Sequence, residues 1–290
     1  MKRPFRIFCL ALTLPALAAL GVPARAQQTD GLVTVDSGKV VSILRADMVM
    51  LDDDKRYRLD NILVPPYEKP AALADLQKTF LGKRVTVYAY RRPQADGTGR
   101  PASDSQGVPL TQIIRRQGSL WAQQELVSQG MAWAYDSPAG NGMLGALKII
   151  EARAREKKLG LWAGSAHAIK TPDNIVNNVG TYQIVEGRIL SVAGSMNRIY
   201  FNFSKDWRDG FSVLLPPDFQ FRWYQDKKDP GYIWRNDVTK WAGRTVRVRG
   251  WVTDVDDKPV IEVTDKGQID VLAQSPPSAP AGAKSVKSAK

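Results

Sequence analysis

The stretch RYRLDNILVPPYE, residues 56–68, combines residue types that could act on a phosphate group. Arg58 stands in a strand-like run, and a guanidinium group can neutralise charge on a phosphate as that charge develops. An arginine on a strand followed by an apolar run and a proline corner is typical of a nucleotide-cleaving site. Such a site would need a carboxylate on each side of the corner, but Leu63 stands on one side and Pro66 on the other.

Residues 30–165 contain the elements that must position these groups. Strand-like runs come first, and an acidic corner at residues 52–54 is typical of a hairpin turn between two of them. A long stretch of loop composition, residues 91–107, separates the last two strands, and two helices close the segment. The expected strands cover residues 31–35, 38–44, 47–51, 56–64, 84–90 and 110–114, and the expected helices cover 71–81, 119–130 and 144–160.

This segment resembles the staphylococcal nuclease (thermonuclease) family. The resemblance lies in VSILRADMVML, YRLDNILVPP, DSQGVPLTQII, ELVSQGMAWAY and ARAREKKLGLWAG, in that order along the chain. It implies a five-stranded OB barrel with three helices. It also implies calcium-dependent hydrolysis of DNA and RNA, if the family's functional residues are present.

Compared with the family pattern, the functional positions are only partly kept. Asp47 stands at a metal-binding position, whereas Leu63 replaces a second metal-binding carboxylate and Pro66 replaces the glutamate that activates water. Arg58 matches one of the two phosphate-binding arginines. Val108 aligns with the other in the match that best fits the loop lengths.

A competing alignment through DGTGR keeps that arginine as Arg100. Loss of a general base alone costs about 10²–10⁴ in rate. We therefore expect no intact catalytic or metal site, with Arg58, Arg100 and Asp47 as remnants and no required cofactor. The alternative is a weak or rewired calcium-dependent nuclease, in which Asp60 or Glu68 has taken the place of the lost metal ligand.

Residues 182–272 read as five short strands with an insert before the fourth, the layout of a second OB-like barrel. The predicted fold class is thus mainly β, with tandem OB-type barrels joined by a polar linker at 166–181. Alternation in RIYFNF and RTVRVRG suggests Tyr200, Arg247 and Arg249 as an outer nucleic-acid-binding face. The same alternation is also expected of an ordinary barrel, in which apolar side chains fill the interior and arginines on the outside face solvent.

The first 26 residues have a basic start, an apolar run and an Ala-Arg-Ala ending, which predicts a cleaved signal peptide and export to the periplasm or beyond. Its removal takes away four cations and lowers the formal net charge from +12 to +8. This charge favours nucleic acid or another polyanion as partner, and envelope proteins are the alternative. Cys9 is the only cysteine, so thiolate catalysis is excluded after cleavage. Residues 275–290 predict a disordered basic tail.

Overall fold

The computed structural model describes residues 31–90, 99–137, 139–195, 197–206, 208, 210–220 and 238–272. The predicted signal peptide and the basic tail lie outside these residues. Within them the chain is strand-rich, as predicted, and no helix has the length and apolar character needed to cross a membrane.

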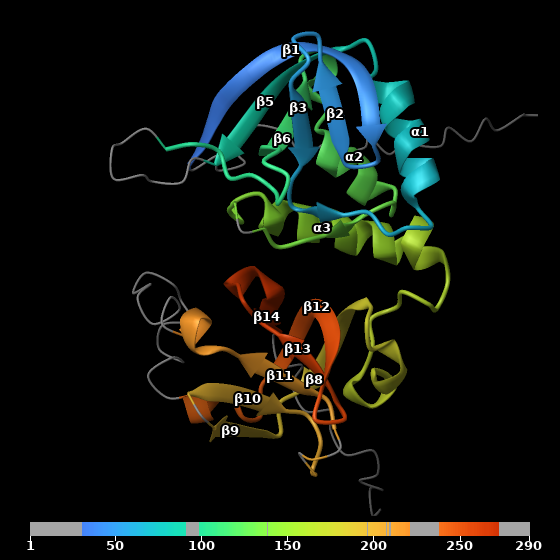
Figure 1. Ribbon diagram of the computed structural model, residues 1–290. Helices are drawn as coiled ribbons and strands as arrows, with labels where there is room; N and C mark the ends of the chain where they lie inside the picture. Colours follow the sequence, from blue (N-terminus) through green and yellow to red (C-terminus); the bar gives the residue numbers. More distant parts are fainter. Residues whose placement is uncertain are drawn as a thin grey trace, which may run out of the picture.

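The first barrel closes in the order β1-β2-β3-β6-β5 (Figure 1). All of its neighbouring strands pair antiparallel except β3 and β6, which pair parallel. Its core contains the fully buried side chains of Leu51, Phe80 and Ile113. The elements are β1 (Leu32–Arg45), β2 (Met48–Leu51), β3 (Arg56–Leu59), α1 (Lys69–Phe80), β5 (Arg84–Tyr90), β6 (Leu110–Arg115), η1 (Gln117–Ser119), α2 (Ala122–Ser128), α3 (Leu144–Glu156) and η2 (Gly160–Ala163).

The two strand runs expected at 31–35 and 38–44 form a single long strand. β1 is continuous because its first half pairs with β5 and its second half pairs with β2, so the chain bends across the barrel without a turn. A shift of register between Thr34 and Asp36 absorbs part of that bend. The acidic corner at residues 52–54 is the turn between β2 and β3, as predicted.

A short two-stranded sheet lies beside the barrel and matters for the site. β4 (Ile62–Leu63) pairs with β7 (Trp133–Ala134), so that Leu63 lies opposite Trp133 and Ile62 opposite Ala134. β4 follows Arg58 in the sequence, and β7 follows α2. The pairing therefore connects the wall of the first barrel to the helical part of the domain.

The second barrel is built from a seven-stranded sheet in the order β14-β12-β13-β11-β10-β9, with β8 also paired to β12. As in the first barrel, one pair of strands, β11 with β13, is parallel. The expected first strand is broken at Ile189, which exchanges backbone hydrogen bonds with Arg244 and Gly243. Trp241 packs in the core on Phe201, with ring centroids 5.0 Å apart. Its elements, with those of the linker, are η3 (Pro172–Asn174), η4 (Val176–Asn178), β8 (Tyr182–Arg188), β9 (Ser191–Ser195), β10 (Arg198–Asn202), β11 (Ser212–Leu215), η5 (Val238–Trp241), β12 (Thr245–Val255), β13 (Lys258–Glu262), η6 (Lys266–Gln268) and β14 (Ile269–Val271).

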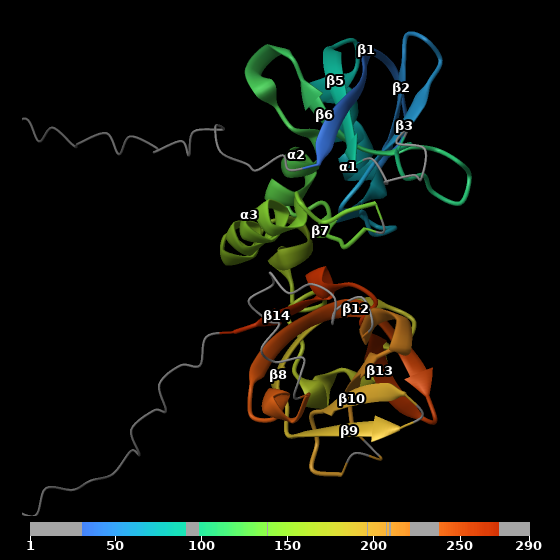
Figure 2. The same cartoon turned by 90° about the vertical axis from the view of Figure 1, so that its left-hand side faces the viewer.

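Helix α3 lies between the two barrels (Figures 1 and 2). Its Lys148 forms an ion pair with Asp270 of β14 at 2.7 Å. Its Glu151 forms a second ion pair with Arg249 of β12 at 3.0 Å. The exterior of the second barrel is thus partly covered by the first domain.

Candidate functional site

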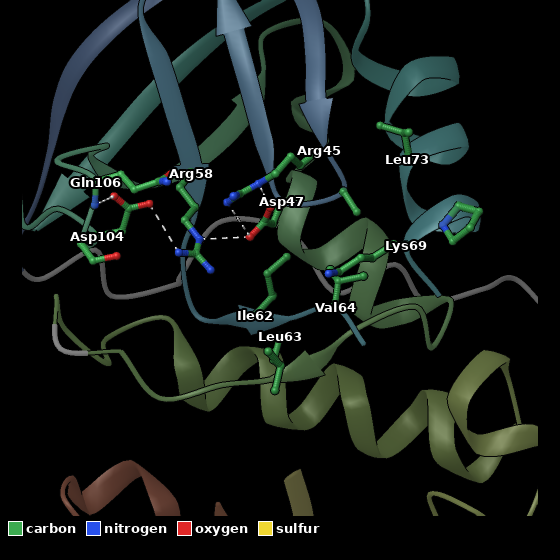
Figure 3. Close-up of a pocket in the computed structure, with 13 residues that line it drawn as sticks. Arg45, Asp47, Arg58, Ile62, Leu63, Val64, Lys69, Leu73, Asp104 and Gln106 are labelled. Atoms are coloured by element: carbon green, nitrogen blue, oxygen red, sulfur yellow. Dashed lines mark hydrogen bonds and ion pairs between the residues drawn. The ribbon is translucent and has the colours of Figure 1, made fainter. Parts of the chain in front are cut away.

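A cleft of about 710 Å³ opens where the β1–β2 hairpin, β4 and the start of α1 meet (Figure 3). Of the site residues predicted in the first domain, it contains Asp47, Arg58 and Leu63. Three cations and two carboxylates line it, together with an apolar wall. The lining residues are Arg45, Ala46, Asp47, Arg58, Ile62, Leu63, Val64, Lys69, Pro70, Leu73, Asp104, Ser105 and Gln106.

Asp47 is held between two arginines. Arg58 Nε donates to its Oδ2 at 3.0 Å, and Arg45 Nε donates to its Oδ1 at 3.1 Å. Figure 3 shows both guanidinium groups directed at this carboxylate. Both oxygens of Asp47 therefore already accept charge-assisted hydrogen bonds.

Asp104 is the second carboxylate of the cleft. Its Oδ1 accepts from the backbone N–H groups of Gln106 and Val108, each at 2.9 Å, and Arg58 Nη1 approaches Oδ2 at 3.4 Å. Burial alone would raise the pKa of Asp104, but the two backbone hydrogen bonds and the charge of Arg58 hold it below its usual value. The carboxylate closes its own loop and anchors Arg58.

Two lining residues that sequence reasoning did not propose are Asp104 and Lys69. The signal for Asp104 was its place before Ser105, Gln106 and Gly107, a spacing at which an aspartate caps a tight loop. Lys69 gave no comparable signal, because the first residue of a helix can face any direction. In the described part of the chain Lys69 makes no ion pair, so it adds an uncompensated positive charge to the cleft.

At three positions, Leu63, Pro66 and Val108, a functional residue of the family is replaced. Of these three residues, only Leu63 lines the cleft. Val108 borders a separate, shallower depression with Lys55 and Arg56. Pro66 is exposed at the corner and lies outside the cleft lining. Leu63 borders the cleft, but its side chain points toward α3 in Figure 3 and packs against the apolar cluster that contains Trp133 and Leu161.

The proposed substitutes for the lost groups are not brought into the cleft. Asp60 is 5% exposed and does not line it; its side chain is hydrogen-bonded to Ser137, and burial raises its pKa to about 6. Glu68 stands at the start of α1 outside the lining, and Arg100 is exposed elsewhere. Asp60 lies apart from Arg58 because the strand ends at Leu59 and the chain turns there.

The comparisons with known proteins place this segment in a family. The model of the family described as "Staphylococcal nuclease homologue" matches residues 52–164. These residues form a staphylococcal nuclease domain. The match includes Arg58, Leu63 and Asp104 and begins after Arg45 and Asp47.

A relative of the nuclease domain is a "Probable endonuclease LCL3" from Verticillium alfalfae, 30% identical over 109 residues. The aligned region covers 37% of this chain and 35% of that protein. This chain therefore spans about a third of the length of the curated relative that it matches. The second barrel lies outside the residues that the family model matches.

For the second barrel, the structure changes the interpretation of one of the three residues predicted to bind nucleic acid, Arg249. Arg249 does point away from the barrel core, opposite Val246 and Val248, but it is only 2% exposed because it packs against the nuclease domain. Its guanidinium group donates to both oxygens of Glu151 and to the carbonyl of Ala134. A buried, paired arginine cannot contact a nucleic acid, so the prediction for Arg249 was wrong.

The other two residues of that face remain at the surface. Arg247 pairs with Glu186 of the neighbouring strand β8 at 2.9 Å. Tyr200 is partly buried on β10, which lies outside the strands that contact α3. Of the tryptophans near the insert, Trp207, Trp223 and Trp234 lie outside the described residues.

Proposed function

We propose that this chain is an exported protein that binds single-stranded nucleic acid, through its phosphates, in the cleft of the nuclease domain without hydrolysing it. The observation that carries the proposal is the arrangement around Asp47. Arg58 remains positioned for a phosphate, while both oxygens of the carboxylate that would serve a metal are engaged by Arg58 and Arg45.

The donor set fits calcium poorly. Calcium takes about 6–8 oxygen ligands, whereas the cleft offers two carboxylates, each bound to arginine. Within the described residues, no group of three or more histidine, cysteine, aspartate or glutamate side chains lies close enough together to hold a metal ion. Leu63 adds no oxygen ligand to the wall. We therefore derive no catalytic step through a metal.

The cleft has instead the features of an anion site. Arg45, Arg58 and Lys69 outnumber the two carboxylates, and the formal net charge of the chain is also positive. Ile62 and Leu73 form an apolar wall against which a base or sugar would pack. Such a site binds through electrostatics, and we expect affinity to fall steeply as salt is added.

Hydrolysis is the second candidate function, because the relative of this domain is named as a probable endonuclease. In that case cleavage would need calcium.

A scaffold that binds protein partners is the other alternative, and its binding to those partners would depend little on salt concentration.

The test measures both binding and cleavage of single-stranded DNA and RNA oligonucleotides by residues 27–290, with calcium and with a chelator. Binding is expected under both conditions, with the strand uncleaved. Arg58→Ala should weaken binding about tenfold and reduce the salt slope by about one, since one phosphate contact is lost. Arg84→Ala, at an exposed arginine of β5 outside the cleft, is the matched control and should bind like the wild type.

Calcium-dependent cleavage that disappears in Arg58→Ala would replace the binding proposal with hydrolysis. Absence of both binding and cleavage would reject nucleic acid as the partner. Export is tested separately by N-terminal sequencing of the protein recovered outside the cytoplasm. We expect it to begin at Gln27, and recovery of the uncleaved chain inside the cell would contradict export.

A further inference from the structure

The two domains are joined by specific polar contacts. Arg249 Nη1 donates to the carbonyl of Ala134 at 2.7 Å, and Glu151 Oε1 accepts from the N–H of the same residue at 2.9 Å. Farther along the junction, Lys148 pairs with Asp270. The contacts of Arg249 fix the middle of β12 against β7, and Tyr135 directly follows β7.

An aromatic surface lies at this junction. Trp251 of β12 contacts Tyr182 with ring centroids 5.9 Å apart, and Tyr182 contacts Tyr135 at 5.4 Å. The side chain of Trp251 also hydrogen-bonds to Tyr135. Tyr182 is buried, whereas Trp251 is 49% exposed and Tyr135 is partly exposed. One domain thus contributes Tyr135 to the surface and the other contributes Trp251.

This aromatic surface is close to the phosphate-binding end of the cleft. The N–H of Tyr135 donates to the carbonyl of Asn61, three residues after Arg58, at 2.9 Å. Ala134, the residue before Tyr135, pairs with Ile62, which lines the cleft. A chain bound at Arg58 can therefore continue toward Trp251.

The charges at the junction favour a base over a phosphate there. Asp136 adjoins Tyr135, and Asp265 is near enough to raise the pKa of Asp136 further, to about 6, beyond the effect of burial. Two carboxyl groups repel phosphate but do not oppose the stacking of an uncharged base. An exposed indole face is a common platform for unpaired bases in proteins that bind single strands.

We propose that Trp251, together with Tyr135, stacks a base farther along a single-stranded nucleic acid that Arg58 holds by a phosphate. This inference rests on the proposed function of the cleft. It makes the second barrel part of the binding site, through an exposed aromatic residue that the domain junction holds beside the nuclease domain.

The experiment compares two thymidine ligands by fluorescence anisotropy: a dinucleotide, which fills the cleft alone, and an octamer, which is long enough to reach the junction. Trp251→Ala should weaken octamer binding about 5- to 100-fold, the range expected when one stacked base is lost. It should leave dinucleotide binding unchanged. Trp251→Phe should recover much of the octamer affinity, because it keeps an aromatic face.

Leu190→Ala is the control, since it removes another exposed apolar side chain of the same barrel, 47% exposed, that has no predicted role in binding. It should bind both ligands like the wild type. Equal octamer affinity of wild type and Trp251→Ala would reject the role of Trp251 while leaving the cleft proposal intact. Failure of the wild type to bind either ligand would instead reject the proposed function itself.

Discussion

At the scale of single residues, the carboxylates of the nuclease domain differ in whether an arginine forms an ion pair with them. Asp47 and Asp104 are each paired with arginine in the cleft. Asp60 is different, because it is buried and is hydrogen-bonded to Ser137 and the backbone of Asn61, with Arg58 acting only through its charge. Burial outweighs these effects and raises its pKa to about 6, against 3.8 for the unperturbed group.

Asp60 should therefore make the protein less stable at neutral pH than in mild acid. The folded state binds the proton of Asp60 more tightly than the unfolded state, so its contribution to stability is fully present below about pH 4 and is lost as pH rises through about 6. Asp60→Asn should raise the free energy of unfolding by about 1–3 kcal/mol at pH 7, with little effect at pH 4.

Urea denaturation at the two pH values measures this difference. Asp54→Asn is the control, because Asp54 is an exposed turn residue whose positive φ asparagine tolerates. An Asp60→Asn variant that is destabilised equally at both pH values would show that hydrogen bonding of the carboxylate, and not its burial, dominates.

At the scale of elements, two glycines fix the ends of α2 and α3 against each other. Gly130 and Gly160 both have positive φ, 71° and 49°. The N–H of Leu161 donates to the carbonyl of Gly130 at 2.8 Å. A Cβ at Gly130 would collide with the carbonyl of Leu159, and a Cβ at Gly160 would collide with the carbonyl of Gly130. This close crossing positions α3, and with it the surface that contacts the second barrel.

Gly130→Ala should lower the free energy of unfolding by about 2–4 kcal/mol, because it combines an unfavourable φ with a backbone clash. Gly145→Ala is the matched control within α3. A Cβ there meets nothing within 4 Å, so this change should stabilise the protein by about 0.5–1 kcal/mol. Thermal or urea unfolding measures both variants, and a neutral Gly130→Ala would mean that the crossing relaxes easily.

At the scale of the whole molecule, the two barrels share a buried ion pair. The side chains of Arg249 and Glu151 are 3% and 1% exposed, and both also bind the backbone of Ala134. Around them the junction is apolar and aromatic, with Trp133, Leu161 and Tyr182 buried together. A charge left alone in this environment would be poorly solvated.

Arg249→Met should therefore cost about 3–5 kcal/mol, and adding Glu151→Met should recover part of that loss, because the second change removes the unpaired charge. Arg247→Met is the control on the same strand; its pair with Glu186 is partly exposed and should contribute less than about 1 kcal/mol. Chemical denaturation followed by tryptophan fluorescence measures the series. A double variant no more stable than Arg249→Met alone would mean that the hydrogen bonds to Ala134, and not the ion pair, hold the junction.

The single histidine illustrates a contact that spacing could not predict. His167 follows the last helix and reads as a connector residue. In the structure its ring stacks on Tyr67, with the hydroxyl 2.6 Å from Nε2, and meets the edge of Trp133. The linker is thereby held against the proline corner, 100 residues earlier in the chain.

The sequence by itself determined the parts of this protein that depend on local pattern. Alternating apolar residues predicted the strands of the first barrel, and the order of its motifs predicted the nuclease domain. The resemblance to the nuclease family also indicated that Arg58 and Asp47 belong to one site, and the structure brings them into contact. These features follow from periodicity and turn chemistry, which act over a few residues.

Only the tertiary structure decided which charged side chains are buried, which form ion pairs and which line the cleft. Alternation correctly turned Arg249 away from its own barrel, but the fold then covered that face with α3, 98 residues away in the chain. In the same way Asp60 was left buried when the chain turned after β3, and Lys69 was brought into the cleft by the start of α1. The physical reason is that burial and ion pairing depend on what packs against a face, and that neighbour is set by contacts between distant segments.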